Sequence, residues 1–168
     1  AVAADFTPAS YSNYGKEVTI SAPGGDTEYY NPVGQDDPEG WEEGIHSGSI
    51  LSTWIQNGNA TYGFMDGTSM ACPHVSGVAA LGLSYAVKQR RHFKATEFIE
   101  LLKNSAKPLD GWYTGGKVKT YYRNHLSAGA SPTKVELSKY VGKMGTGLVN
   151  AGSLLNSIEG SGSDMVVP

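Results

Sequence analysis

The residues best able to do chemistry lie in one segment, Gly67-Thr68-Ser69-Met70-Ala71-Cys72-Pro73-His74-Val75-Ser76-Gly77. Small and apolar side chains continue beyond it and predict a helix over residues 69–88, apolar on nearly all sides and therefore buried in a larger fold. A serine at the start of a helix lies beside backbone N–H groups without a helical partner, and such groups can stabilise a developing oxyanion. The pattern thus permits Ser69 to act as a nucleophile, although physics alone favours a plain helix N-cap.

A serine nucleophile needs a general base, and none of the four histidines fits that role. His74 follows Ser69 by five residues, which on a helix turns it about 140° away from the serine. His46, His92 and His125 lie in predicted loops or at a helix end, without a matching motif. We therefore predict that His74 does not accept the serine proton and that the other three face solvent.

Short strands are expected to position the serine helix. Residues 1–4 and 17–20 are apolar or β-branched and predict two strands before the long loop. Residues 50–55 predict a third strand, which ends at the turn signal in residues 57–59. These strands would form the part of a sheet on which the serine helix packs.

Two further helices are expected after the serine helix. Residues 96–106 form an amphipathic pattern with Thr96 as the N-cap, and residues 151–158 follow Asn150, a second N-cap candidate. Residues 109–141 are rich in Tyr, Gly and Lys and predict an irregular surface segment. Residues 159–168 are expected to form a loose tail.

Composition narrows the function classes. The chain has 168 residues and a net charge of −3, and no basic stripe stands out, which argues against a nucleic-acid partner. No run of about 18 apolar residues occurs, so we expect no membrane span. The single cysteine, Cys72, excludes an intrachain disulfide and a cysteine-based zinc cluster. We predict that Cys72 is a buried packing residue rather than a second nucleophile.

A cluster of acids leaves one metal question open. Residues 36–43 hold five carboxylates within a long predicted loop. Oxygen-rich loops can ligate calcium, but the spacing here matches no known motif. A solvated acidic loop is the preferred interpretation, and a structural calcium ion remains the alternative. Catalysis by a serine nucleophile requires no cofactor.

Three segments carry a family resemblance. Residues 67–77 match the nucleophile signature of the subtilases, the subtilisin-like serine peptidases, at every fixed position. Residues 9–15 and 18–24 resemble the "SFSNxG…APG" region that precedes this signature, and residues 145–151 resemble the closing "GxGxVNA" segment. The resemblance covers residues 1–158 except for two apparent insertions at 25–48 and 109–141.

The resemblance implies a role for each residue around the serine. Ser69 would attack the scissile carbonyl while its own N–H donates to the oxyanion, and the Thr68 hydroxyl would assist that donation. Gly67 would let the substrate approach closely, and Met70 would be the oxidation-sensitive neighbour. Asp5 lies where some members of the family hold a weakly bound cation.

The resemblance also implies a fold and a partner. The chain, residues 1–168, would be the C-terminal part of an α/β domain with a doubly wound, mostly parallel sheet and a buried nucleophile helix. The family's "D-[ST]-G" and "HGTHVAG" motifs and the asparagine of its "AxGN" segment do not occur in this sequence. We therefore expect an upstream part of the same domain to supply them, and the isolated chain to be inactive and to fold poorly alone.

Three functional readings follow. The first is a serine endopeptidase, secreted or otherwise extracytoplasmic, that cleaves polypeptides through an acyl-enzyme on Ser69. The second is a degenerate subtilase that acts as a binding module. The third is an esterase of a different fold, which a strand, sharp turn and helix around Ser69 would support.

Overall fold

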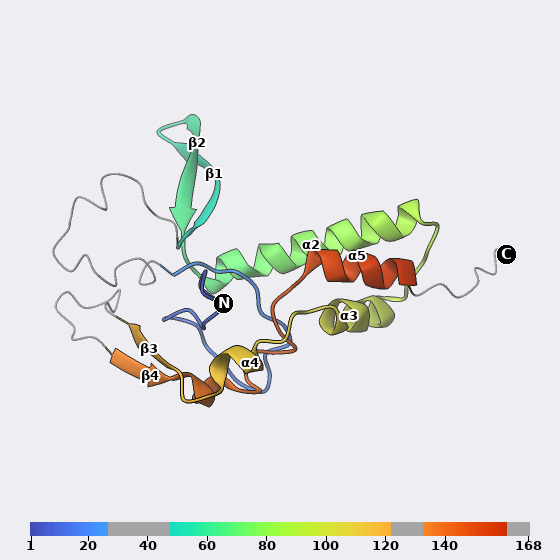
Figure 1. The fold of residues 1–168 in the computed structure, drawn as a ribbon. Coiled ribbons are helices and arrows are strands. Elements are labelled where there is room, and N and C mark those ends of the chain that lie inside the picture. The colour runs from blue at the N-terminus through green and yellow to red at the C-terminus, as the bar shows by residue number, and fades with distance from the viewer. Residues whose placement is uncertain (27–47, 122–132, 161–168) are drawn as a thin grey trace.

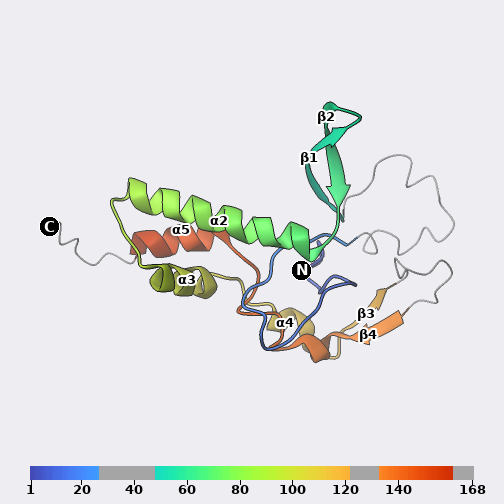
Figure 2. The same cartoon turned by 180° about the vertical axis from the view of Figure 1, so that it is seen from behind.

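The computed structural model describes residues 1–26, 48–121 and 133–160 (Figure 1). Its longest element is helix α2 (Thr68–Lys88), which contains Ser69. Helix α5 (Ala151–Gly160) runs beside α2, and helix α3 (Ala95–Asn104) lies next to α5 (Figures 1 and 2). The helix predicted over residues 69–88 is therefore confirmed.

The three helices share one apolar core. Ala86 from α2, Phe98 and Leu102 from α3, and Leu154 and Ile158 from α5 are its buried members. The α2 helix can approach α5 closely because residue 82 is glycine: a Cβ there would lie 2.6 Å from Leu154 Cδ2. The amphipathic pattern that predicted α3 therefore identifies the correct buried face.

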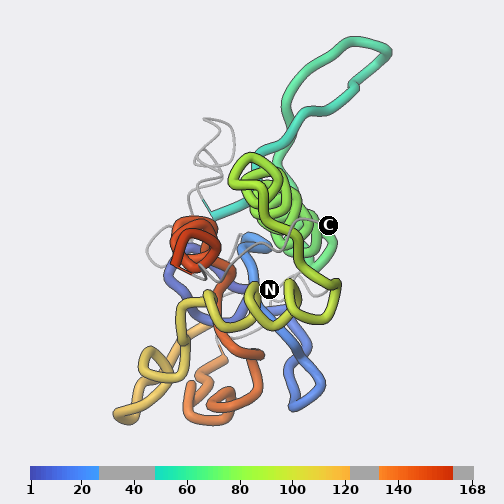
Figure 3. The backbone as a smooth tube through the Cα atoms, turned by 90° about the vertical axis from the view of Figure 1, so that its right-hand side faces the viewer, coloured from blue at the N-terminus to red at the C-terminus, as the bar shows by residue number. Residues whose placement is uncertain are grey.

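An antiparallel hairpin precedes α2. Strand β1 (Ile50–Gln56) pairs with β2 (Asn59–Met65) across a turn at Asn57 and Gly58. Both turn residues have positive φ, 51° and 79°, as a two-residue hairpin turn requires. The strand predicted over residues 50–55 is confirmed, whereas β2 was not anticipated. The hairpin stands away from the helices (Figure 3).

A second core lies below the helices in Figure 1. It combines the N-terminal segment with helix α4 (Asp110–Tyr113) and the 3-10 helix η2 (Leu137–Tyr140). Strands β3 (Val118–Tyr121) and β4 (Thr133–Glu136) form a second antiparallel pair beside it. The prediction that residues 109–141 are irregular is therefore wrong for the described part of this segment. The buried residues of this core are Val2, Leu109, Tyr113, Leu137, Tyr140 and Met144.

The expected parallel sheet is not formed by the described residues. Helices and strands are both present, but the two sheets are small and antiparallel. Parallel pairing is limited to isolated bridges, Val2 with Pro23 and Ser21 with Leu148. Residues 1–4 and 17–20 are consequently not strands, because a strand needs a continuous ladder with a neighbour, and these segments offer only the isolated bridges of Val2, to Pro8 and Pro23.

Helix α2 is also far less buried than its sequence predicts. Within α2 only Ala71, Gly82 and Ala86 are buried, whereas Leu81 and Leu83 remain nearly half exposed. By length and composition alone α2 could cross a membrane, contrary to the expectation that no segment would. The core helix of a soluble protein passes the same test, and here the helix lacks a cover over much of its length.

The helix ends differ from prediction in two places. Lys94, not Thr96, is the N-cap of α3, and its backbone N–H donates to the Glu97 carboxylate over 3.0 Å. Asn150 does cap α5, since its Oδ1 accepts the Ser153 N–H at 3.0 Å. Helix α5 continues to Gly160, so the first two residues of the predicted tail are helical. Residues 161–168 lie outside the described residues.

Candidate active site

Ser69 is the second residue of α2 and is exposed. The first helical acceptor is the Gly67 carbonyl, which receives the N–H groups of Met70 at 3.0 Å and Ala71 at 3.3 Å. The N–H groups of Thr68 and Ser69 precede these donors and so have no helical acceptor. Ser69 therefore lies at the positive end of the helix, where backbone N–H groups without a helical acceptor can stabilise negative charge.

The turn before Ser69 is fixed by a neighbouring backbone. Gly67 N–H donates to the Gly24 carbonyl at 2.9 Å, and Gly24 N–H donates to the Val2 carbonyl at 3.0 Å. A Cβ at Gly24 would lie 2.8 Å from the Gly67 carbonyl oxygen, so only glycine allows this approach. The segment 18–24 thus acts as a support for the serine turn.

Tyr11 stabilises the end of the segment 18–24 by hydrogen bonding. Its hydroxyl lies 2.8 Å from the Gly24 carbonyl oxygen and 2.6 Å from that of Gly25. Burial, followed by the negative charges of Asp66 and Asp26, raises the pKa of the Tyr11 hydroxyl, so it remains a donor. Tyr11 was predicted only as part of a motif, with no role of its own.

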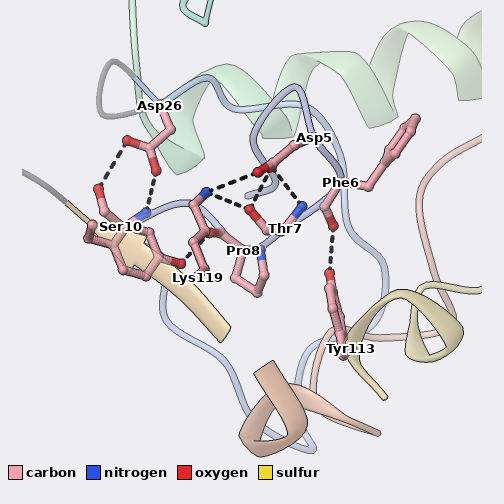
Figure 4. Close-up of polar contacts among 9 residues, drawn as sticks. Asp5, Phe6, Thr7, Pro8, Ser10, Asp26, Tyr113 and Lys119 are labelled. Atoms are coloured by element: carbon pink, nitrogen blue, oxygen red, sulfur yellow. Dashed lines mark hydrogen bonds and ion pairs between the residues drawn. The ribbon is translucent and has the colours of Figure 1, made fainter. Parts of the chain in front are cut away.

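Asp26, two residues after the segment 18–24, accepts hydrogen bonds from the N-terminal segment. Its carboxylate is fully buried and accepts the Ser10 N–H at 2.7 Å and the Ser10 hydroxyl at 3.1 Å (Figure 4). Its bonds to Ser10 show a structural role.

The imidazole ring of His74 contacts the backbone of its own helix. Its Nδ1 lies 2.7 Å from the Met70 carbonyl oxygen, one turn back on α2. Within residues 1–26, 48–121 and 133–160, the Ser69 hydroxyl has no hydrogen-bond partner. The contact with Met70 agrees with the prediction that His74 does not act as the general base. His92 is exposed, as expected, while His46 and His125 lie outside the described residues.

The other residues named around the serine are placed as follows. Gly67 is the N-cap of α2, Thr68 is exposed beside Ser69, and Met70 is half-buried with its sulfur near Gly67. Cys72 is exposed, so the prediction that it is a buried packing residue is wrong within the described structure. Much of α2 is exposed, and Cys72 lies on one of its exposed turns, which explains why the cysteine is not buried.

Asp5 lies in a tight loop next to Lys119 of β3. Its carboxylate accepts the Thr7 N–H at 3.0 Å and the Thr7 hydroxyl, and it lies 3.6 Å from the Lys119 ammonium (Figure 4). The same ammonium contacts the Thr7 hydroxyl and lies 4.8 Å from the centroid of the Tyr121 ring.

This arrangement does not fit a metal ion at Asp5. The lysine ammonium already supplies the positive charge, and no group of three or more His, Cys, Asp or Glu gathers among the described residues. The acidic segment 36–43, the other calcium candidate, lies outside the described residues. Lys119 was not anticipated, because a residue 114 positions along the chain from Asp5 leaves no local pattern.

The chain is similar to known proteases. The sequence model of the subtilase family matches residues 2–146. The extracellular protease of Xanthomonas campestris pv. campestris is 37% identical over 112 residues, which are 64% of this chain and 15% of that protein. The cell wall-associated protease of Bacillus subtilis is 37% identical over 98 residues, 58% of this chain and 8% of that protein. The extracellular basic protease of Dichelobacter nodosus is 34% identical over 103 residues, 61% of this chain and 14% of that protein. The chain thus matches less than a sixth of the length of each of these relatives.

Proposed function

The chain belongs to the subtilase family, and from this membership we propose that it forms part of a serine endopeptidase in which Ser69 is the nucleophile. One observation supports the assignment above all others. Ser69 is exposed at the N-terminus of α2, next to backbone N–H groups that have no helical acceptor. The Gly24–Gly67 hydrogen bond holds this turn in place before any substrate arrives.

The proposed chemistry is acyl transfer. The Ser69 hydroxyl attacks the scissile carbonyl carbon and gives its proton to a histidine base, while the carbonyl oxygen becomes an oxyanion. The Ser69 N–H, assisted by the Thr68 hydroxyl, donates to that oxyanion. The amine leaves with the transferred proton, and water then releases the acyl group from Ser69.

We propose that the histidine, its orienting acid and the oxyanion asparagine come from an upstream part of the same domain. Their motifs do not occur in this sequence, and the relatives it matches are much longer proteins. The upstream part would also complete the doubly wound sheet, of which the bridges Val2–Pro23 and Ser21–Leu148 would be the margin. The open apolar side of α2 is where this part would pack.

The proposed substrates are polypeptides, and the proposed location is extracytoplasmic. Two of the three relatives named above are described as extracellular and the third as associated with the cell wall. Our proposal includes no metal at Asp5, because Lys119 provides the cation there. A calcium ion bound elsewhere in the whole protein is compatible with it.

A serine substitution in the complete protein tests the proposal. Ser69→Ala should lower kcat/KM on a casein-derived peptide about a thousandfold or more, because the nucleophile is lost. Ser76→Ala is the matched control: Ser76 is exposed on the same helix, and its hydroxyl donates to the Cys72 carbonyl and to no other described residue. Equal activities of the two variants would refute the assignment. An inactive wild type with an intact fold would instead favour the degenerate binding module.

A further inference from the structure

A lysine-rich segment runs from Lys107 to Lys143. Seven of the chain's 13 Lys and Arg residues fall within it, against two of the 16 Asp and Glu residues. The rest of the chain is therefore strongly acidic, and the whole has a net charge of −3. The segment lies outside the serine motif, and the proposed peptidase chemistry gives it no role.

Two pairs of its lysines lie over exposed aromatic rings. The Nζ atoms of Lys107 and Lys117 are 5.5 and 5.7 Å from the centroid of the Trp112 ring. Those of Lys139 and Lys143 are 5.4 and 5.7 Å from the centroid of the Tyr14 ring. Trp112 is 40% exposed and Tyr14 is 41% exposed. These six residues, Tyr14, Lys107, Trp112, Lys117, Lys139 and Lys143, are called the lysine–aromatic surface below.

The two halves of this surface are joined by packed rings. Tyr14 meets Tyr140 edge-on at 4.6 Å, and Tyr140 lies 6.2 Å from Tyr113, the residue after Trp112. Tyr113 and Tyr140 are buried, and they belong to α4 and η2, which contact each other. The exposed rings are therefore anchored on a packed core, which fixes where in the fold the lysines around them gather.

Among the described residues, no carboxylate forms an ion pair with the lysines of this surface. In the part of the chain that the structure describes, the ion pairs join Lys103 to Glu100 and Lys119 to Asp5. The four lysines of the lysine–aromatic surface take part in neither. An aromatic face attracts an ammonium group weakly and leaves its outer side in water, where it can still donate to an anion.

We propose that the lysine–aromatic surface binds acidic segments of polypeptide substrates at a distance from Ser69. This inference rests on the proposed peptidase function, which makes polypeptides the ligands available to the protein. In an extended peptide, alternate side chains share one face and are about 7 Å apart, so two carboxylates can reach the two lysines around one ring. The exposed ring between the lysines contacts the aliphatic part of the same peptide.

Binding of a labelled peptide to the complete Ser69→Ala protein tests this proposal. The probe is a fluorescein-labelled poly-glutamate peptide at low salt, with a poly-glutamine peptide of equal length as the reference. Lys117→Gln/Lys139→Gln should raise Kd about tenfold, because one charge is lost from each half of the surface. Lys88→Gln/Lys94→Gln removes the same net charge elsewhere and should change Kd less than about twofold.

The outcomes separate the inference from its premise. Lys117→Arg/Lys139→Arg should restore binding, and added salt should weaken it, since the contacts are electrostatic. Equal losses in the two glutamine variants, no binding to poly-glutamate, or tighter binding of single-stranded DNA would each overturn the proposal. The readout is binding rather than turnover, so these results can be judged separately from whether Ser69 is the nucleophile.

Discussion

The serine turn and the helix that follows it differ in how completely they are packed. At the turn, Gly24 meets Gly67 through their backbones, and the neighbouring Ser21 is buried against Gly147 and Val149. More than three turns further along α2, Leu81 and Leu83 are 48% and 47% exposed, although both belong to the most apolar of the described helices. The backbone before the serine is thus closely packed, whereas much of the apolar helix after it is open.

This difference indicates which half of the site the chain builds by itself. Close packing occurs where segments 18–24, 67–71 and 145–150 meet, the same segments that carry the family resemblance. The open apolar side marks where we propose that the upstream part of the domain lies. The following substitutions, made in the complete protein, test that division.

Gly145→Ala should cause the largest loss of stability. Gly145 has a φ of 71°, and a Cβ there would lie 2.5 Å from the Thr19 backbone. Strain and overlap together should lower the free energy of unfolding by about 3 kcal/mol. Gly142→Ala is the control, since Gly142 has a φ of 69° with open space around it and should cost about 1 kcal/mol. Urea unfolding measures both, and equal losses would mean that the packed side is not crowded.

Leu81→Ala tests the open side. If the upstream part covers α2, this change should cost about 2 kcal/mol, close to that for a buried leucine. Ile99→Ala is the control, because Ile99 is 50% exposed on α3, away from the proposed cover, and should cost about 0.5 kcal/mol. Similar small losses for both residues, again from urea unfolding, would show that α2 remains exposed in the complete protein.

Lys119→Met tests the connection between β3 and the Asp5 loop. The Lys119 and Asp5 side chains are 10% and 28% exposed, so their ion pair is partly shielded from solvent. Its removal should lower the free energy of unfolding by about 1 kcal/mol. Lys134→Met on the neighbouring strand is the control. A double-mutant cycle with Asp5→Asn measures the coupling, and a coupling of zero would contradict the assigned pair.

Tyr11→Phe should produce the smallest effect, seen mainly at alkaline pH. Because the pKa of Tyr11 is raised in the folded state, its stabilising contribution is complete below the unfolded value of 10.0 and declines as the pH rises above it. The variant should therefore lose less stability than wild type between about pH 9 and pH 11. Tyr62→Phe, with its ring 71% exposed, is the control. Parallel pH profiles for wild type and Tyr11→Phe would contradict this role.

The sequence predicted local features well and distant partnerships poorly. The helix with Ser69, the cap at Asn150 and the first hairpin strand each depend on neighbouring residues, and each is present. Lys119 could not be predicted, because its partner Asp5 is far away in the chain. The basic character of the Lys107–Lys143 segment was missed for the same reason: its lysines are dispersed in sequence and gather only around the folded rings. The burial of α2 was overestimated, because an apolar composition shows that a helix favours burial but not that other residues of this chain cover it.

Fluorophosphonate labelling tests the central claim most directly. The reagent would be applied to the isolated 168-residue chain and to the complete protein, and the modified peptide mapped by mass spectrometry. We predict a label on Ser69 in the complete protein, none in the isolated chain, and none in the Ser69→Ala variant. A label on another serine, or equal labelling of Ser69 in the isolated chain, would contradict the account.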